Sequence, residues 1–133
     1  MKPYPMLVAV VLLSASCSFG PKLAEFAPAH TPNGVSARVT TRGLDMNGEL
    51  IEVRDNGVVL LTAGSGKLRL IPYGDVRSSN FERLGHLIEG GRTPDSATRE
   101  RLRLVSRFPQ GMSPEVLQTL LKASGQSELL GIQ

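Results

Sequence analysis

The sequence predicts an α+β protein, in which a small barrel of five short antiparallel strands precedes a C-terminal helical hairpin and follows a signal peptide. Three observations support this. Short apolar or alternating runs separated by turn residues extend from Val35 to Phe81, two helix-start signatures follow Thr93, and a charged then apolar segment opens the chain. With 133 residues, 41% of them hydrophobic, the chain can build one modest core.

Residues 1–16 have the three-part order of a secretory leader. "MKPYPM" carries the positive charge of Lys2, "LVAVVLL" is apolar, and the small residues "SAS" follow. The apolar run from Met6 to Leu13 is much shorter than the roughly 20 residues of a transmembrane helix. We therefore expect residues 1–16 to be a signal peptide and the protein to be exported to the cell envelope.

The segment "LSASC", which ends at Cys17, resembles the lipobox of bacterial lipoproteins. The resemblance implies that the Cys17 thiol carries diacylglycerol, that cleavage occurs just before it, and that the new amino terminus is acylated. Ala15 and Ser16 match the family pattern, whereas Ser14 stands where the family usually has Leu. Cleavage by the ordinary signal peptidase, with Ser14 and Ser16 as its small residues, is the alternative. In enterobacterial lipoproteins an Asp directly after the cysteine resembles an inner-membrane retention signal. Residue 18 is Ser instead, so the outer membrane is favoured if the cell is Gram-negative.

The residues after Cys17 are rich in proline, with Pro21, Pro28 and Pro32 before residue 34. Proline fixes φ and removes a backbone donor, so this segment is not expected to form a long helix. We interpret residues 17–34 as the lipidated cysteine and a flexible tether. A tether of this length reaches on the order of 20 Å, enough to hold a domain just clear of the head groups.

Five short strands are expected next. "VSARVTTR" alternates from Val35, and "GELIEVR" at residues 48–54 alternates except that Leu50 falls on its polar face. "DNG" at residues 55–57 leads straight into "VVLLT", which predicts a hairpin with a type I′ turn. "AGSGK" is the next turn, "LRLIPY" the fourth strand, and the fifth runs from about Val76 to Phe81.

These strands resemble SH3-like and Sm-like small barrels, from "NGELIEVRDNGVVLLT" to "LRLIPYGDVRSS". The Sm pattern is matched by Gly48, by Asp55 and by the short turn Tyr73–Val76. The resemblance covers about a third of the chain, and it implies the fold. Because Sm-like proteins usually bind RNA on rings, an Sm-like nucleic-acid-binding protein is the alternative function. Export and the absence of an aromatic stacking site or a basic loop mean that no nucleic acid partner is expected.

Two helices complete the chain. The first is expected to start with Thr93 as N-cap and Pro94 as first residue, and to bury a broken apolar stripe of Ala97, Leu104 and Phe108, flanked by Leu102 and Val105. The second is expected to start with Ser113 as N-cap and Pro114, to end before Gly125, and to present an apolar face of Val116, Leu117, Leu120 and Leu121. The tail, residues 127–133, is either a last strand or a disordered end.

Two helices joined by a short turn must bury their apolar faces. We expect them to cover the barrel as a lid, and the alternative is that the second helix binds a partner or a second copy. Seven arginines lie between Arg77 and Arg107 beside four acids, so this part could face anionic head groups or an acidic partner. An ordinary surface of Arg–Glu pairs is the favoured alternative. The candidate interaction surface comprises Arg99, Arg103, Arg107, Leu117 and Leu121.

The sequence shows no pattern of catalytic or metal-binding residues. Cys17 is the single cysteine, His30 and His86 are far apart, and "AGSGKL" lacks the flanking residues of a phosphate-binding loop. The net charge of +3 is mild. We therefore expect no enzymatic activity, no cofactor, no metal and no small-molecule substrate. The expected function is that of a membrane-anchored envelope lipoprotein that acts as an interaction or assembly module, with an envelope protein or itself as partner.

The predicted organisation has five parts. They are a signal peptide at residues 1–16, the lipidated cysteine and tether at 17–34, the small barrel at 35–84, the helical hairpin at 85–126 and the tail at 127–133.

Overall fold

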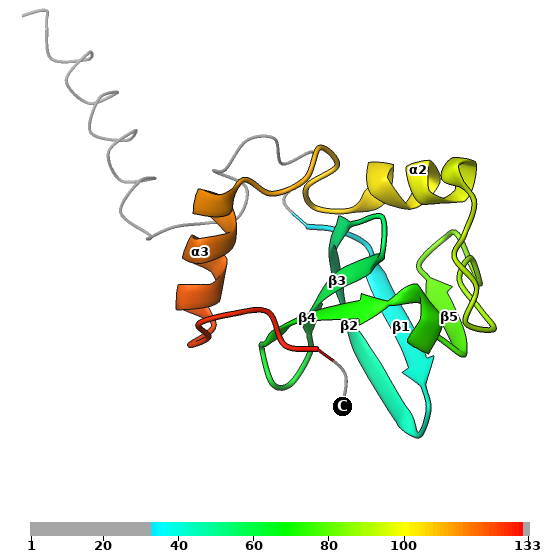
Figure 1. Ribbon diagram of the computed structural model, residues 1–133, viewed down its shortest axis with the longest axis horizontal. Coiled ribbons are helices and arrows are strands. Elements are labelled where there is room, and N and C mark those ends of the chain that lie inside the picture. Colours follow the sequence, from blue (N-terminus) through cyan, green and yellow to red (C-terminus); the bar gives the residue numbers. More distant parts are fainter. Residues whose placement is uncertain (1–32, 132–133) are drawn as a thin grey trace, which may run out of the picture.

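The computed structural model describes residues 33–131, so the predicted signal peptide, Cys17 and nearly all of the predicted tether lie outside the described residues. The described part is α+β, with a five-stranded antiparallel sheet, a short 3-10 helix and two α-helices (Figure 1). None of its helices is long and apolar enough to cross a membrane. The elements in chain order are β1 (Ser36–Thr41), β2 (Leu44–Val53), β3 (Gly57–Thr62), β4 (Leu68–Pro72), η2 (Tyr73–Asp75), β5 (Ser78–Phe81), α2 (Ser96–Val105) and α3 (Pro114–Ala123).

The sheet has the strand order β4-β3-β2-β1-β5, and all neighbours are antiparallel. The first four strands follow one another as hairpins, while β5 returns beside β1. The fifth strand begins at Ser78 rather than near Val76 and is therefore shorter than expected. The reason is that η2 forms the turn before it, and Val76 is the buried C-cap residue of η2. In this order, β4 and β5 are the two edge strands.

The hairpin between β2 and β3 is confirmed, but its predicted type I′ turn is wrong. Neither Asn56 nor Gly57 has the positive φ that this turn requires. Gly57 serves a different purpose, because a Cβ there would lie 2.3 Å from the Ile71 carbonyl oxygen of β4. Glycine at this position therefore allows the close approach of a neighbouring strand.

A β-bulge in β2 explains why Leu50 broke the expected alternation. Leu50 pairs with Leu60, yet the next paired residue, Glu52, faces Val59, so Ile51 is the extra residue. Leu50 consequently lies in one hydrophobic cluster and Ile51 in the other. Both side chains are buried, although they are adjacent in the sequence. The bulge thus lets β2 contribute to two cores.

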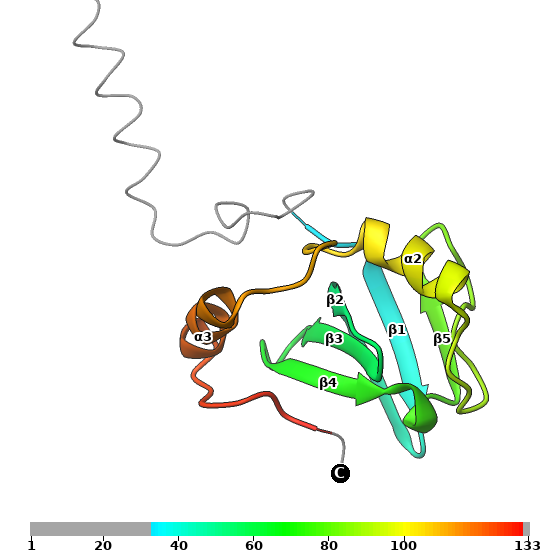
Figure 2. The same cartoon turned by 45° about the horizontal axis from the view of Figure 1, so that its top comes forward.

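The two hydrophobic clusters are separated by the central strands. The first contains residues from all five strands together with Leu102 of α2, and the second contains Ile51, Val59 and Leu68 with Phe108 and residues of α3. Strand β3 is buried on both faces, which accounts for its continuous apolar sequence "GVVLLT". Figures 1 and 2 show α2 and α3 over different parts of the sheet.

The helices therefore do not form the predicted hairpin, and each packs on the sheet instead. The segment between them runs along β2, where the Arg107 and Phe108 amides donate to the carbonyls of Leu50 and Ile51 at 3.0 Å each. These bonds hold Phe108 in the second cluster and separate the two helices. The expectation that the helices bury their apolar residues against the sheet is confirmed, in the form of two separate packings.

Helix α2 starts later than expected. Asp95, not Thr93, is the N-cap, because its carboxylate accepts the Thr98 amide at 2.8 Å. The hydrogen bond from the Thr98 backbone also lowers the pKa of Asp95. The predicted apolar stripe is wrong in part: Leu102 is fully buried, whereas Ala97 is exposed and Leu104 is 53% exposed.

Helix α3 matches its prediction closely. Ser113 accepts the Val116 amide at 3.2 Å as N-cap, Pro114 is the first residue, and Gly125 follows the C-cap with φ of 72°. Its apolar residues Val116, Leu120 and Leu121 are buried in the second cluster.

Both edges of the sheet are covered by other segments. The side-chain amide of Gln126 accepts the Leu68 N–H at 2.8 Å and donates to the Leu68 carbonyl at 3.0 Å, and Leu70 donates to Leu130 at 2.9 Å. The described part of the tail therefore lies along β4. At the other edge Ser79 exchanges hydrogen bonds with the backbone of Ile88. This covering prevents further strand pairing at these sites.

Tyr73 gives a direct test of the packing around η2. Its hydroxyl donates to the Arg54 carbonyl at 2.6 Å, and burial raises the pKa of Tyr73 to about 12. In a chain without residues 1–16 it is the single tyrosine, so ultraviolet titration reports it alone. The phenol's contribution to stability is fully present below the unfolded pKa, about 10, and is lost as the pH rises through about 12. We expect a midpoint near 12 for the folded protein and near 10 in urea; a folded midpoint near 10 contradicts this packing.

Candidate interaction surfaces

Arg107, a residue of the predicted interaction surface, is buried and is not accessible to a partner. Its side chain is 7% exposed and forms a double ion pair with Glu49, with Nε–Oε2 at 2.7 Å and Nη2–Oε1 at 2.8 Å. Nη2 also donates to Asn33 Oδ1 at 2.9 Å, and Glu49 accepts the Gly34 amide at 2.7 Å. Arg107 takes this position because the segment between α2 and α3 is hydrogen-bonded along β2. We refer to Arg107, Glu49, Asn33 and Gly34 as the clasp.

The other residues of that predicted surface are also partly engaged. Arg103 pairs with Glu100 at 2.8 Å, and Arg99 donates to the Pro94 carbonyl at 2.5 Å. Leu121 is buried, and Leu117 packs half-buried against the second cluster. The five residues therefore do not form one accessible surface. The Arg103–Glu100 pair agrees with the alternative of an ordinary charged helix surface.

A hollow lies over strands β1, β2, β3 and β5 and the β3–β4 turn, and we call it the polar hollow after the row of polar side chains along it. Its volume is about 760 Å³, and it is open to solvent. The strand register places Asn47 of β2 and Asn80 of β5 on either side of Arg38. The remaining lining residues are the polar Ser36, Glu49, Thr62 and Glu82 and the small or apolar Ala37, Gly48, Leu61, Ala63, Gly64 and Gly66. This arrangement brings residues from three strands into one row of polar side chains.

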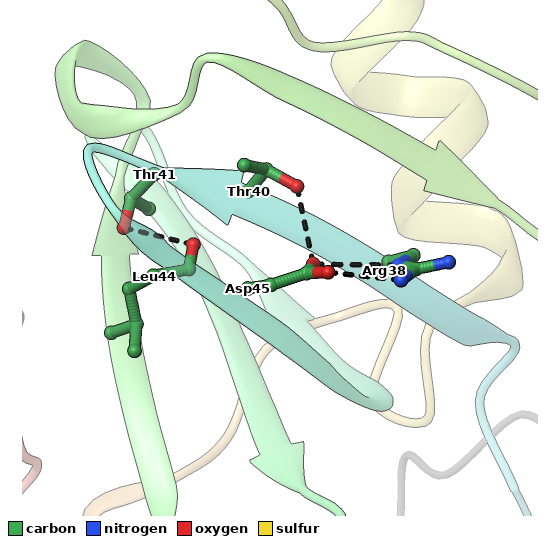
Figure 3. A network of polar contacts seen from close by, with 5 residues as sticks. All are labelled: Arg38, Thr40, Thr41, Leu44 and Asp45. Atoms are coloured by element: carbon green, nitrogen blue, oxygen red, sulfur yellow. Dashed lines mark hydrogen bonds and ion pairs between the residues drawn. The ribbon is translucent and has the colours of Figure 1, made fainter.

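Arg38 is held in place by its neighbours (Figure 3). Its Nη2 donates to Asp45 Oδ2 at 2.9 Å and its Nε to Oδ1 at 3.4 Å, while Thr40 donates to Oδ1 at 3.1 Å. The hydrogen bond from Arg38 lowers the pKa of Asp45, and the same bond raises that of Arg38. Because both side chains are largely exposed, the pair adds little stability and mainly fixes the direction of the guanidinium.

The hollow is suited to hydrogen bonding with polar groups of a partner. Asn47 and Asn80 are exposed, and within residues 33–131 their side chains make no hydrogen bond. Asparagine is disfavoured in strands, yet two of them flank Arg38 here. Carboxamides donate and accept, and a guanidinium binds carboxylates. Within the same described range no group of three or more His, Cys, Asp or Glu residues could hold a metal.

A second hollow, of about 420 Å³, lies where the described chain begins. It is lined by Asn33, Val35, Glu82, Arg83, Leu84, Leu104 and Val105. The Val35 amide donates to the Val105 carbonyl at 3.1 Å, which joins the start of the domain to the end of α2. Figures 1 and 2 show this end of α2 beside the start of β1, with the β1–β2 turn at the far end of that strand.

Comparisons of the chain with protein-family models, with curated proteins and with solved structures gave no match. The sequence-based prediction had not indicated either hollow. The alternation of "VSARVTTR" did place Ser36, Arg38 and Thr40 on one face, but Asn80 joins them only because β5 pairs with β1.

Proposed function

We propose that the protein is an exported, non-enzymatic lipoprotein of the cell envelope, anchored through acyl chains on Cys17, and that its folded domain is an interaction or assembly module. The leader order of residues 1–16 and the lipobox-like "LSASC" support the anchor. The described domain begins 16 positions after Cys17, which leaves room for a tether. In a Gram-negative cell, Ser18 supports the outer membrane as its location.

The proposal takes the sheet to be a small barrel of the SH3-like or Sm-like type. Support comes from the strand order, in which β5 returns beside β1, and from η2 between β4 and β5. Gly48 adds to it, because a Cβ there would lie 2.4 Å from the Leu61 carbonyl oxygen, so glycine permits a close approach of β3. The covered edges speak against rings built by strand pairing between copies, and hence against the Sm-like nucleic-acid-binding alternative.

The polar hollow is the surface that we assign to a protein partner. The observation that carries this assignment is the row Asn47–Arg38–Asn80, in which a braced guanidinium lies between two exposed carboxamides with no hydrogen bond inside residues 33–131. Neighbouring strands are about 4.8 Å apart, so the row spans roughly 10 Å. That length fits several consecutive polar groups of a peptide segment.

Site-specific photo-crosslinking in intact cells tests the assignment. A photoreactive amino acid in place of Asn47 is expected to give a crosslinked adduct of one discrete mass. Adding Arg38→Glu to the same chain is expected to abolish this adduct, because the new carboxylate repels the carboxylate of the partner. The matched control is Lys122, which is also exposed but lies on α3. Adducts of equal yield at both positions, or an adduct insensitive to Arg38→Glu, contradict the assignment.

A further inference from the structure

We propose that the domain rests on the lipid bilayer through the Leu104 face, the surface around the second hollow formed by Leu104, Leu84, Val105, Val35 and Arg83. The occupant of this face is a bilayer surface containing anionic head groups. The inference rests on the proposed anchoring at Cys17, and it adds an orientation: the end of the domain where the chain begins faces the membrane.

The first argument is exposure. Within residues 33–131 the exposed large hydrophobic residues are Leu104, at 53%, and Leu44, at 42%. Leu104 adjoins three half-buried apolar residues in one hollow, whereas Leu44 stands next to the β1–β2 turn. Apolar surface gathered in this way gains free energy when it leaves water, and a head-group region offers such an environment.

The second argument is position. Asn33, the first described residue, lines the same hollow and is bound by Arg107 of the clasp. The chain therefore leaves the domain at the Leu104 face on its way to Cys17. A lipid at Cys17 keeps this end near the bilayer. Leu44 lies at the other end of β1, a strand of six residues or about 20 Å.

The third argument is charge. Arg83 lies on the rim of the hollow, and Arg101 lies three residues before Leu104 on the same side of α2. Both are exposed, and neither pairs with a carboxylate within residues 33–131. The acids nearby are Glu100, which pairs with Arg103, and Glu82, whose carboxylate accepts the Ser36 amide at 3.2 Å. Cations around an apolar centre fit an anionic bilayer surface.

Fluorescence of two single-substitution variants, Leu104→Cys and Leu44→Cys, tests this orientation. Each full-length variant is produced in cells, purified from membranes and labelled with an environment-sensitive thiol probe. It is then reconstituted into vesicles of neutral phospholipid with and without an anionic phospholipid. We expect a blue-shifted emission at position 104 that lipid-borne nitroxides quench, greater in anionic vesicles, and no shift or quenching at position 44.

The outcomes separate the inference from the function on which it rests. If the unsubstituted chain takes up the thiol probe, Cys17 is free and the proposed anchor is wrong. If the unsubstituted chain stays unlabelled but positions 104 and 44 report the same aqueous environment, the anchor stands and the orientation is wrong. A blue shift at position 104 that lipid nitroxides do not quench indicates contact with a second copy and also overturns the inference.

Discussion

Replacing Arg107 by methionine is expected to lower the free energy of unfolding by about 2–3 kcal/mol, because it leaves the half-buried Glu49 carboxylate without its cation. Glu49 would keep only its bond from Gly34, and Asn33 would lose the donor that Arg107 supplies. Domains of this size are typically stable by about 5–15 kcal/mol, so the loss is large. Urea unfolding of the wild type and the variant, followed by circular dichroism, measures it.

Arg103→Met is the matched control for this prediction. Arg103 lies four residues earlier, and its pair with Glu100 is solvent-exposed, so its loss should change stability by less than about 1 kcal/mol. The double variant Arg107→Met/Glu49→Met should recover much of the loss, since no unpaired carboxylate then remains at this position. Equal effects of Arg107→Met and Arg103→Met would show that the clasp does not stabilise the fold as its geometry indicates.

The second large effect is expected from Cys17→Ala, which should move the protein from the membrane fraction to the soluble fraction. Each buried methylene of an acyl chain contributes about 0.8 kcal/mol, and two or more chains anchor a protein stably. The few exposed arginines of the domain provide a much weaker, salt-sensitive attraction. Fractionation of cells at low and high salt, with immunodetection of the protein, measures the redistribution.

Ser14→Leu is the companion variant. It restores the residue that the lipobox family usually has at that position, so membrane association should persist and processing should be at least as complete as in the wild type. A Cys17→Ala protein that remains with the membranes at high salt would instead mean that something other than a lipid on this cysteine holds it there.

Much of the fold was predictable because its signals are local. Alternation indicated β1, the apolar run "GVVLLT" indicated β3, and Ser113-Pro114 marked the start of α3. The start of α2 was less well determined, because Thr93 and Asp95 are both good N-cap residues. Leu102 and Leu104 lie about 200° apart around the helix, so only one of them can face the sheet; packing places Leu102 inside and leaves Leu104 exposed.

The features that escaped prediction depend on contacts between distant segments. The bulge at Ile51 is visible only once β2 is paired with β3, and Arg107 looks like any surface arginine until its segment binds β2. The polar hollow needs Asn80, which lies 42 positions after Arg38 and meets it through strand pairing. Local composition instead favoured the arginine-rich region around α2 as an interaction surface, but Arg103 and Arg107 form ion pairs with Glu100 and Glu49 of the same chain.

The central claim is that Cys17 carries the lipid which holds this domain at a membrane. Intact-mass spectrometry of the protein purified from membranes tests it most directly. We expect a chain that begins at Cys17, with a mass increased by a diacylglycerol group and an amide-linked acyl chain. A chain cleaved at another bond, or one that begins at Cys17 with an unmodified thiol, would contradict the claim.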